Sequence, residues 1–289
     1  MYPMYESLMP ATLNEALDML AGREDVLPIA GGTNVVVAMR EGWYQGQTLM
    51  DVTRLGELRG IRLEGGYVVI GGGTTVAELL DSALIADHAR PLYQAAQTFA
   101  NPLVRKRATV AGNIVDASPA ADAALPLLVL HAEVVLASAI RTRRLPLDQF
   151  IVGVNRTVRR LDELVVAIRW PIPPAHSAAA FHKLALRKGT ACSVLSAAVM
   201  VEGNGQGLVS QARIALGAVA AKPIRAYAAE KALAGQVLTE TIVEETARLA
   251  AGAAQPIDDV RSTATYRKRM VGVLTRRLLV EVAAELGWE

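Results

Sequence analysis

The sequence contains almost no cysteine, because Cys192 is the only one among 289 residues. One thiol cannot form an intrachain disulfide, and it cannot supply the several thiolates of a zinc or iron–sulfur site. The four histidines are scattered without metal-ligand spacing: His88, His131, His176 and His182. We therefore expect no metal in this chain and interpret all four histidines as structural or surface residues.

Long apolar runs are also missing. The longest, residues 125–140, is interrupted by His131 and Glu133 and is shorter than the ~20 residues of a membrane span. The first six residues lack the positive start and apolar core of a signal peptide. The formal net charge is only +2 and the basic clusters are short, so no field favours nucleic acid or anionic lipid. We expect a cytoplasmic protein that binds neither nucleic acid nor a membrane.

Two familiar nucleotide-binding motifs are absent as well. The sequence has no P-loop of the form Gly-x-x-x-x-Gly-Lys-Ser/Thr, and no Gly-x-Gly-x-x-Gly opens a helix in an alternating βα series. Instead it has two short loops of small residues, 30–34 (Ala-Gly-Gly-Thr-Asn) and 109–113 (Thr-Val-Ala-Gly-Asn). Glycine lets a backbone approach a ligand closely and point successive N–H groups at one anion. The pair of loops predicts a diphosphate held from both sides.

The hydrophobic pattern predicts two domains. Residues 171–174 (Pro-Ile-Pro-Pro) form the clearest linker, because proline continues neither a helix nor a strand ladder. The domain before it, 1–174, divides into subdomains of about 1–59 and 60–174, each with one glycine loop. The remaining residues, 175–289, form a smaller α+β domain.

The pattern of the second domain differs from that of the first. Alternating stretches predict a three-stranded antiparallel sheet at residues 180–187, 194–202 and 212–220. Helical periodicity follows at residues 223–234, 239–251 and 260–286. The fold class is therefore α+β.

The order of the motifs resembles a known family. The two glycine loops and the following residues 118–122 (Ser-Pro-Ala-Ala-Asp) are similar to the FAD-binding subunit of molybdenum hydroxylases. That family includes xanthine dehydrogenase, carbon monoxide dehydrogenase and quinoline oxidoreductase. The similarity continues past the linker at residues 181–183 (Phe-His-Lys), 187–189 (Arg-Lys-Gly) and 259–261 (Asp-Val-Arg). It implies a two-subdomain FAD-binding fold of the PCMH or vanillyl-alcohol-oxidase type, followed by the small α+β domain.

The resemblance also implies which residues contact a non-covalently bound FAD. Backbone N–H groups of the first loop would wrap the diphosphate, and the second loop, with the Asn113 amide, would close the other side. Asp122 would contact the sugar portion, and Phe99 would lie beside the isoalloxazine ring. The full implied set is Ile29, Ala30, Gly31, Gly32, Thr33, Asn34, Val35, Val36, Phe99, Thr109, Ala111, Gly112, Asn113, Asp122, Val165 and Lys183. Asn34 stands where many relatives carry an acid or another small polar residue, and we expect little effect on FAD binding because that loop acts through its backbone.

The residues themselves leave simpler alternatives open. The glycines of both loops are also typical of ordinary turns. Phe99 lies on the apolar stripe of its predicted helix, so a core role fits it equally well. Asp122 fits a helix cap, and Lys183 alternates outward on its predicted strand, as a solvent-facing lysine would.

The resemblance implies an electron-transfer subunit with no catalytic residue of its own. In that family a small subunit with [2Fe–2S] clusters passes electrons to FAD, a large subunit carries molybdopterin, and FAD reduces an external acceptor. We expect both partners here, with the assembly doubled as a dimer of heterotrimers. Two alternatives are a self-contained flavin oxidase of the same fold and a non-enzymatic module whose loops bind nothing. The oxidase would need a larger substrate-capping domain and often a histidine tether to the flavin.

Overall fold

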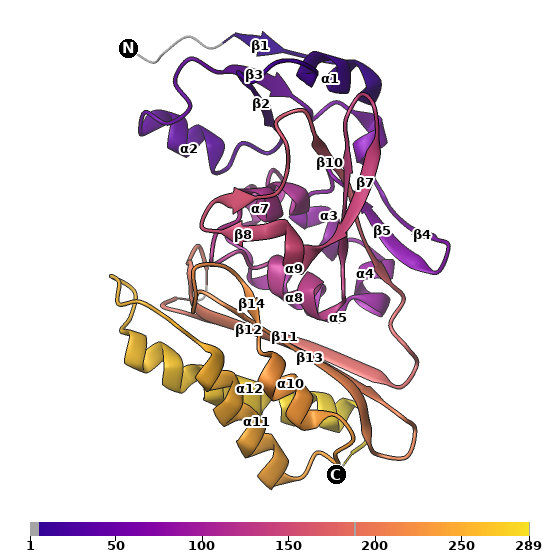
Figure 1. The fold of residues 1–289 in the computed structure, drawn as a ribbon, viewed down its shortest axis with the longest axis vertical. Coiled ribbons are helices and arrows are strands. Elements are labelled where there is room, and N and C mark those ends of the chain that lie inside the picture. The colour runs from indigo at the N-terminus through magenta and orange to yellow at the C-terminus, as the bar shows by residue number, and fades with distance from the viewer. Residues whose placement is uncertain (1–5, 188, 289) are drawn as a thin grey trace.

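The computed structural model describes residues 6–187 and 189–288, and its layers follow one another in chain order (Figure 1). A small parallel sheet with its helices lies at one end of the long axis. A five-stranded sheet with its helices occupies the middle, and a four-stranded sheet covered by helices lies at the other end. Within the described ranges, no helix combines the length and apolarity needed to cross a membrane.

The first layer is a parallel sheet with the strand order β1-β3-β2. Its elements are β1 (Ser7–Leu8), α1 (Leu13–Leu20), β2 (Val26–Ile29), α2 (Val35–Arg40), β3 (Thr48–Asp51) and the 3-10 turn η1 (Gly56–Leu58). The Thr12 hydroxyl caps α1 by accepting from the backbone N–H of Glu15 at 3.2 Å. Strand β2 ends at Ile29, so its carboxyl end leads directly into the first glycine loop.

The middle layer is an antiparallel sheet with the order β4-β5-β10-β6-β7. Its strands are β4 (Ile61–Glu64), β5 (Tyr67–Gly71), β6 (Glu133–Ala137), β7 (Thr142–Pro146) and β10 (Leu164–Pro171), with the hairpin β8 (Ile151–Gly153) and β9 (Arg156–Thr157) beside it. The helices are α3 (Val76–Leu80), α4 (Ala83–His88), α5 (Arg90–Thr98), α6 (Pro102–Arg105), α7 (Val110–Asp116), α8 (Ala124–Val129) and α9 (Leu147–Phe150). Because β10 returns to the sheet after the helices, it lies between β5 and β6 and brings its first residues to the first layer.

The last layer is a sheet with the order β11-β12-β13-β14 and three helices. Its elements are β11 (Ser177–Ala185), β12 (Ser193–Gly203), β13 (Val209–Gly217), β14 (Ile224–Arg225), α10 (Tyr227–Leu233), α11 (Glu240–Ala253) and α12 (Ala264–Glu285). The predicted three-stranded sheet is therefore extended by a fourth strand. Strand β14 pairs with the edge of β13 over two residues, which is too short a segment for hydrophobic periodicity to reveal. For the same reason the helix predicted to begin at residue 223 begins at Tyr227.

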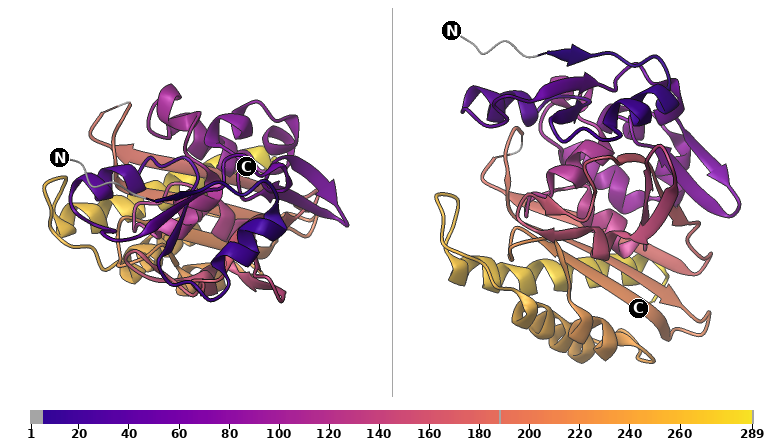
Figure 2. Two further views of the ribbon diagram at one scale, coloured as in Figure 1. Left: turned by 90° about the horizontal axis from the view of Figure 1, so that it is seen from above. Right: turned by 45° about the horizontal axis from the view of Figure 1, so that its top comes forward.

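Both faces of the β11–β13 sheet are covered. Phe181 and Met200 point into the core that contains α5 and α8, whereas Val199 and Ile214 point into the core with α10, α11 and α12. Residues 193–201 of β12 are consequently all buried. Figure 2 gives two further views of this sheet between its helices. The sheet thus joins the middle layer to the C-terminal helices through continuous apolar packing.

A buried arginine anchors the loop before α12. The Arg267 side chain is 3% exposed, bonds to the Asp259 carboxylate and donates to the Ala218 carbonyl at 3.4 Å. Asp259 also accepts from the backbone and the guanidinium of Arg261, at 2.8 and 2.7 Å. The bonds from Arg267 and Arg261 hold the pKa of Asp259 well below its ordinary value of 3.8.

We predict that Asp259→Asn destabilises the protein at neutral pH and makes its free energy of unfolding less dependent on pH in acid. The folded-state pKa of Asp259 is depressed, so its stabilisation is complete above the ordinary pKa and is lost as the pH falls through the folded-state pKa. Removing one charged partner should lower the free energy of unfolding by about 1.5–3 kcal/mol. Urea unfolding at a series of pH values should show that the difference in the free energy of unfolding between wild type and variant becomes smaller in acid. The exposed Asp18→Asn is the matched control, and a pH-independent difference would contradict the prediction.

Candidate functional site

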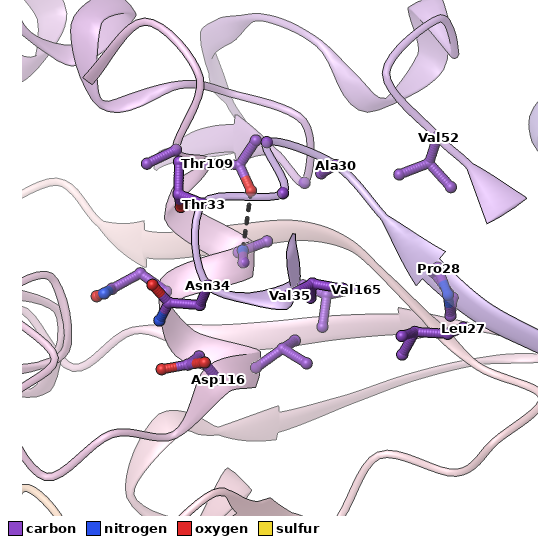
Figure 3. A pocket seen from close by; sticks show the side chains of 18 of the residues that line it. Leu27, Pro28, Ala30, Thr33, Asn34, Val35, Val52, Thr109, Asp116 and Val165 are labelled. Atoms are coloured by element: carbon purple, nitrogen blue, oxygen red, sulfur yellow. Dashed lines mark hydrogen bonds between the residues drawn. The ribbon is translucent and has the colours of Figure 1, made fainter. Parts of the chain in front are cut away.

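The two glycine loops meet at one cavity of about 240 Å³ (Figure 3). The predicted residues that line this cavity are Ala30, Gly31, Gly32, Thr33, Asn34, Val35, Phe99, Thr109, Ala111, Gly112, Asn113 and Val165. They come from the loop after β2 with the first residue of α2, the end of α5, the N-terminal half of α7 and the start of β10. Segments far apart in the sequence therefore converge on one site.

Gly31 makes the close approach of the two loops possible. A Cβ atom at this position would overlap the Arg107 carbonyl, two residues before the second loop begins. Gly32 has φ +68°, a left-handed conformation that a side chain disfavours. An ordinary turn requires only a positive φ such as that of Gly32. The close contact of Gly31 with another chain segment therefore distinguishes this loop from an ordinary turn.

The first loop carries backbone donors that the protein does not use. In the described residues, no acceptor receives the N–H groups of Gly31, Gly32 or Thr33. Buried or half-buried N–H groups are ordinarily paired, and successive unpaired ones form a concavity suited to an anion. The loop therefore fits a ligand that carries phosphate oxygens.

The second loop is fixed by its own side chains. The Thr109 hydroxyl accepts from the backbone N–H of Gly112 at 3.0 Å, the bond drawn in Figure 3. The Asn113 side-chain carbonyl accepts from the backbone N–H of Ala123 at 3.2 Å. The Asn113 amide nitrogen is the part of that side chain left to face a ligand, so the loop is positioned before any ligand binds.

Four predicted contacts do not line the cavity: Ile29, Val36, Asp122 and Lys183. Ile29 belongs to β2, and Val36 is 40% exposed on α2. Asp122 and Lys183 instead bind each other, with 2.5 Å between Oδ2 and Nζ and side chains only 8% and 5% exposed. This pair joins the segment after α7 to β11.

Two of the simpler alternatives for these residues are wrong. Lys183 does not face solvent, because its side chain is only 5% exposed and its ammonium pairs with Asp122. Asp122 does not cap a helix either, since α8 begins after Ala123 and the carboxylate accepts from the Ser193 hydroxyl at 2.8 Å. Burial raises the pKa of Asp122, whereas Lys183 and Ser193 act in the opposite direction. Phe99 is half-buried and packs against the core, and it also lines the cavity, so its contact with the flavin ring stays a prediction.

The sequence analysis missed part of the cavity wall. The additional lining residues are Leu27, Pro28, Tyr44, Val52, Leu58, Gly72, Ala108, Val115, Asp116, Asn155, Arg159 and Leu164. A Cβ atom at Gly72 would overlap the Val165 carbonyl, so the run of three glycines that begins with the last residue of β5 allows two segments to approach closely and does not only form a turn. Leu27 and Pro28 lie within β2, and Val52 directly follows β3, the neighbouring parallel strand. Figure 3 shows them on the opposite side of the view from Thr33, Asn34 and Asp116.

Comparisons with known proteins identify the family of the chain. A family model described as the FAD binding domain in molybdopterin dehydrogenase matches residues 3–173. A second, the CO dehydrogenase flavoprotein C-terminal domain, matches residues 179–282. The chain is an FAD-binding medium subunit of the molybdenum hydroxylase family.

Individual relatives resemble the medium subunit over nearly its whole length. The nicotinate dehydrogenase FAD-subunit of Eubacterium barkeri is 32% identical over 98% of this chain and 97% of its own. The carbon monoxide dehydrogenase medium chain of Hydrogenophaga pseudoflava is 32% identical over 96% of both chains. A structure of carbon monoxide dehydrogenase from the same organism superposes with a TM-score of 0.94 at 33% identity, covering 98% of this chain and 99% of that one. Quinoline 2-oxidoreductase from Pseudomonas putida 86 gives a TM-score of 0.91 at 26% identity, covering 99% of each chain.

The residues of the medium subunit fit FAD. The unpaired N–H groups of the first loop suit a diphosphate, and the glycines at positions 31 and 72 keep side chains out of the space between segments. Phe99 supplies an aromatic side chain to the wall. The chemistry that FAD supplies when bound is the transfer of electrons, and the protein's part is to bind and orient it.

We predict that Gly31→Val or Gly32→Val prevents FAD binding. Valine at position 31 would collide with the backbone of Arg107, and at position 32 it would disfavour the positive φ that orients the loop. FAD titration followed by flavin fluorescence should show no saturation, while circular dichroism should show that the C-terminal layer remains folded. Gly56→Val is the matched control, since Gly56 has open space and no positive φ. Unchanged FAD affinity in either variant would mean that the loop is only a turn.

A second prediction concerns the buried ion pair. Lys183→Met should lower the free energy of unfolding by about 3–5 kcal/mol, because it leaves the Asp122 carboxylate buried without its cation. The double variant Asp122→Asn, Lys183→Met should recover much of that loss. Urea unfolding of the FAD-free chain measures the free energy of unfolding of the single and the double variant, with the exposed Lys231→Met as a control. Equal losses in the single and double variants would show that packing, and not the unpaired charge, dominates.

Proposed function

We propose that this subunit passes electrons from the [2Fe–2S] clusters of a small partner subunit, through its FAD, to an external acceptor. A large molybdopterin subunit would hydroxylate the organic substrate. The observation that carries the proposal is the pair of loops joined at Gly31, with N–H groups free to hold a diphosphate and Phe99 in the same cavity wall. The match along nearly the full length of a carbon monoxide dehydrogenase medium chain supports it.

The residues of this chain have limited tasks in that function. The loop of Gly31 and Gly32 would bind the diphosphate with its backbone, and the loop of Thr109 and Gly112 would close the opposite side. Phe99, at the end of α5, would fix the plane of the isoalloxazine ring. Binding and orientation of this kind need no acid–base pair in the chain, since the redox chemistry belongs to the cofactor.

We also propose the domain division that the linker predicts, 1–174 and 175–289, with subdomains of about 1–59 and 60–174. Three hydrophobic cores support this division, although the β11–β13 sheet contributes side chains to two of them. The dimer of heterotrimers and the cytoplasmic location stay predictions of the sequence.

Purification of the subunit alone and of its complex from the native host tests the proposed function. The isolated chain should be yellow, carry about one FAD and release it intact on heating. A panel of purines, aldehydes and N-heterocycles should leave its flavin absorbance unchanged. In the complex, one of these compounds should bleach the flavin, and mass spectrometry should identify small and large partner chains.

The alternatives give different results in the same experiment. An isolated chain that oxidises one of the compounds would be a self-contained oxidase. A colourless chain that takes up no added FAD would be an interaction module. Flavin that remains with the denatured polypeptide would contradict the non-covalent binding.

A further inference from the structure

Arg159 is the one basic residue among the described residues that line the FAD cavity. It lies on the segment between β9 and β10, shortly before Leu164 and Val165, which line the same cavity. No sequence motif singles it out. The glycine loops offer only uncharged donors, so Arg159 would add the only full positive charge among the described lining residues.

The position of the Arg159 guanidinium is set by backbone carbonyls. Its Nη1 donates to the carbonyl of Arg160 at 3.0 Å and to that of Glu163 at 2.7 Å. One end of the planar group is therefore fixed, while the remaining N–H groups are left for another partner. An arginine anchored in this way loses little further conformational entropy when it binds a ligand.

The nearby carboxylate is already engaged elsewhere. The Glu163 side chain is 2% exposed and forms a two-point ion pair with Arg143, at 2.7 and 2.8 Å. It also accepts from the backbone N–H of Arg160 at 2.8 Å. Among the described residues, Arg159 forms no ion pair with any carboxylate, including the Asp116 carboxylate of the same cavity.

Burial leaves the Arg159 charge poorly solvated. It lowers the pKa of Arg159, whereas Glu163 and Asp162 act in the opposite direction. A half-buried cation without a carboxylate partner is destabilising until an anion approaches it. In a cavity whose first loop presents unpaired N–H groups, a phosphate is the anion that suits both features.

We propose that Arg159 binds the diphosphate of FAD through its guanidinium, as a charged contact in addition to the backbone donors of the glycine loops. The inference rests on the placement of FAD in this cavity. Guanidinium and phosphate form paired, charge-assisted hydrogen bonds that a backbone N–H group cannot match. Arg159 would thus make FAD affinity depend on the diphosphate and on ionic strength.

The test compares FAD binding by the deflavinated wild-type chain with that of Arg159→Gln and Arg159→Lys. Glutamine is polar but removes the charge, and we expect it to weaken FAD binding by about 10- to 100-fold. Lysine keeps the charge but lacks the planar guanidinium, so Arg159→Lys should lose less FAD affinity than Arg159→Gln. Added salt should weaken FAD binding by the wild type more than by Arg159→Gln. Arg160→Met is the matched control, because Arg160 is exposed and does not line the cavity.

Competition by ADP and adenosine identifies the part of the ligand that Arg159 contacts. The wild type should prefer ADP, and Arg159→Gln should lose most of that preference. Equal losses for ADP and adenosine would overturn the proposal in favour of stacking on the adenine. Wild-type FAD affinity in Arg159→Gln would overturn the proposal as well.

If Arg159→Gln does not fold, the salt dependence and the ADP preference of the wild type decide, and their absence rejects the proposal. Failure of the wild type to bind FAD would instead reject the placement of FAD in this cavity.

Discussion

The close approach of the Gly31 loop to the Arg107 backbone is the constraint on which the rest of the site depends. A Cβ atom at position 31 would overlap the Arg107 carbonyl and force the segments apart, so the contact exists only because Gly31 has no side chain. It brings the loop that follows β2 of the parallel sheet against the segment between α6 and α7 of the middle layer. The cavity between them then has backbone donors on one side and α7 on the other, which is the arrangement a dinucleotide requires.

A second set of interactions holds the C-terminal layer against this site. The β11–β13 sheet shares one core with α5 and α8, and the buried pair of Asp122 and Lys183 adds a charged contact at the same junction. The Lys183 ammonium also lies 3.4 Å from the Thr98 carbonyl, next to Phe99. Residues that the family resemblance assigns to the cofactor thus also determine how the two parts of the chain fit together. Their stability and binding roles have to be measured separately.

The predicted strands β11–β13 were found because each contains alternating apolar residues, and the two loops because adjacent glycines are visible in any sequence. The fourth strand was missed since two paired residues carry no periodicity. The interpretation of Lys183 as solvent-facing was wrong because alternation assigns a residue to a face, and both faces of this sheet are covered. The family resemblance fixed the cofactor class, but it did not reveal that Asp122 and Lys183 bind each other.

The sequence by itself determined the α+β class, the loops and the family, since all three depend on local composition and order. Tertiary structure alone decided which segments share the cavity wall. Leu27, Gly72 and Arg159 belong to three separate segments, and no local pattern links them. The physical reason is that their proximity follows from the return of β10 between β5 and β6 and from the contact at Gly31, both of which are set by packing over long sequence separations.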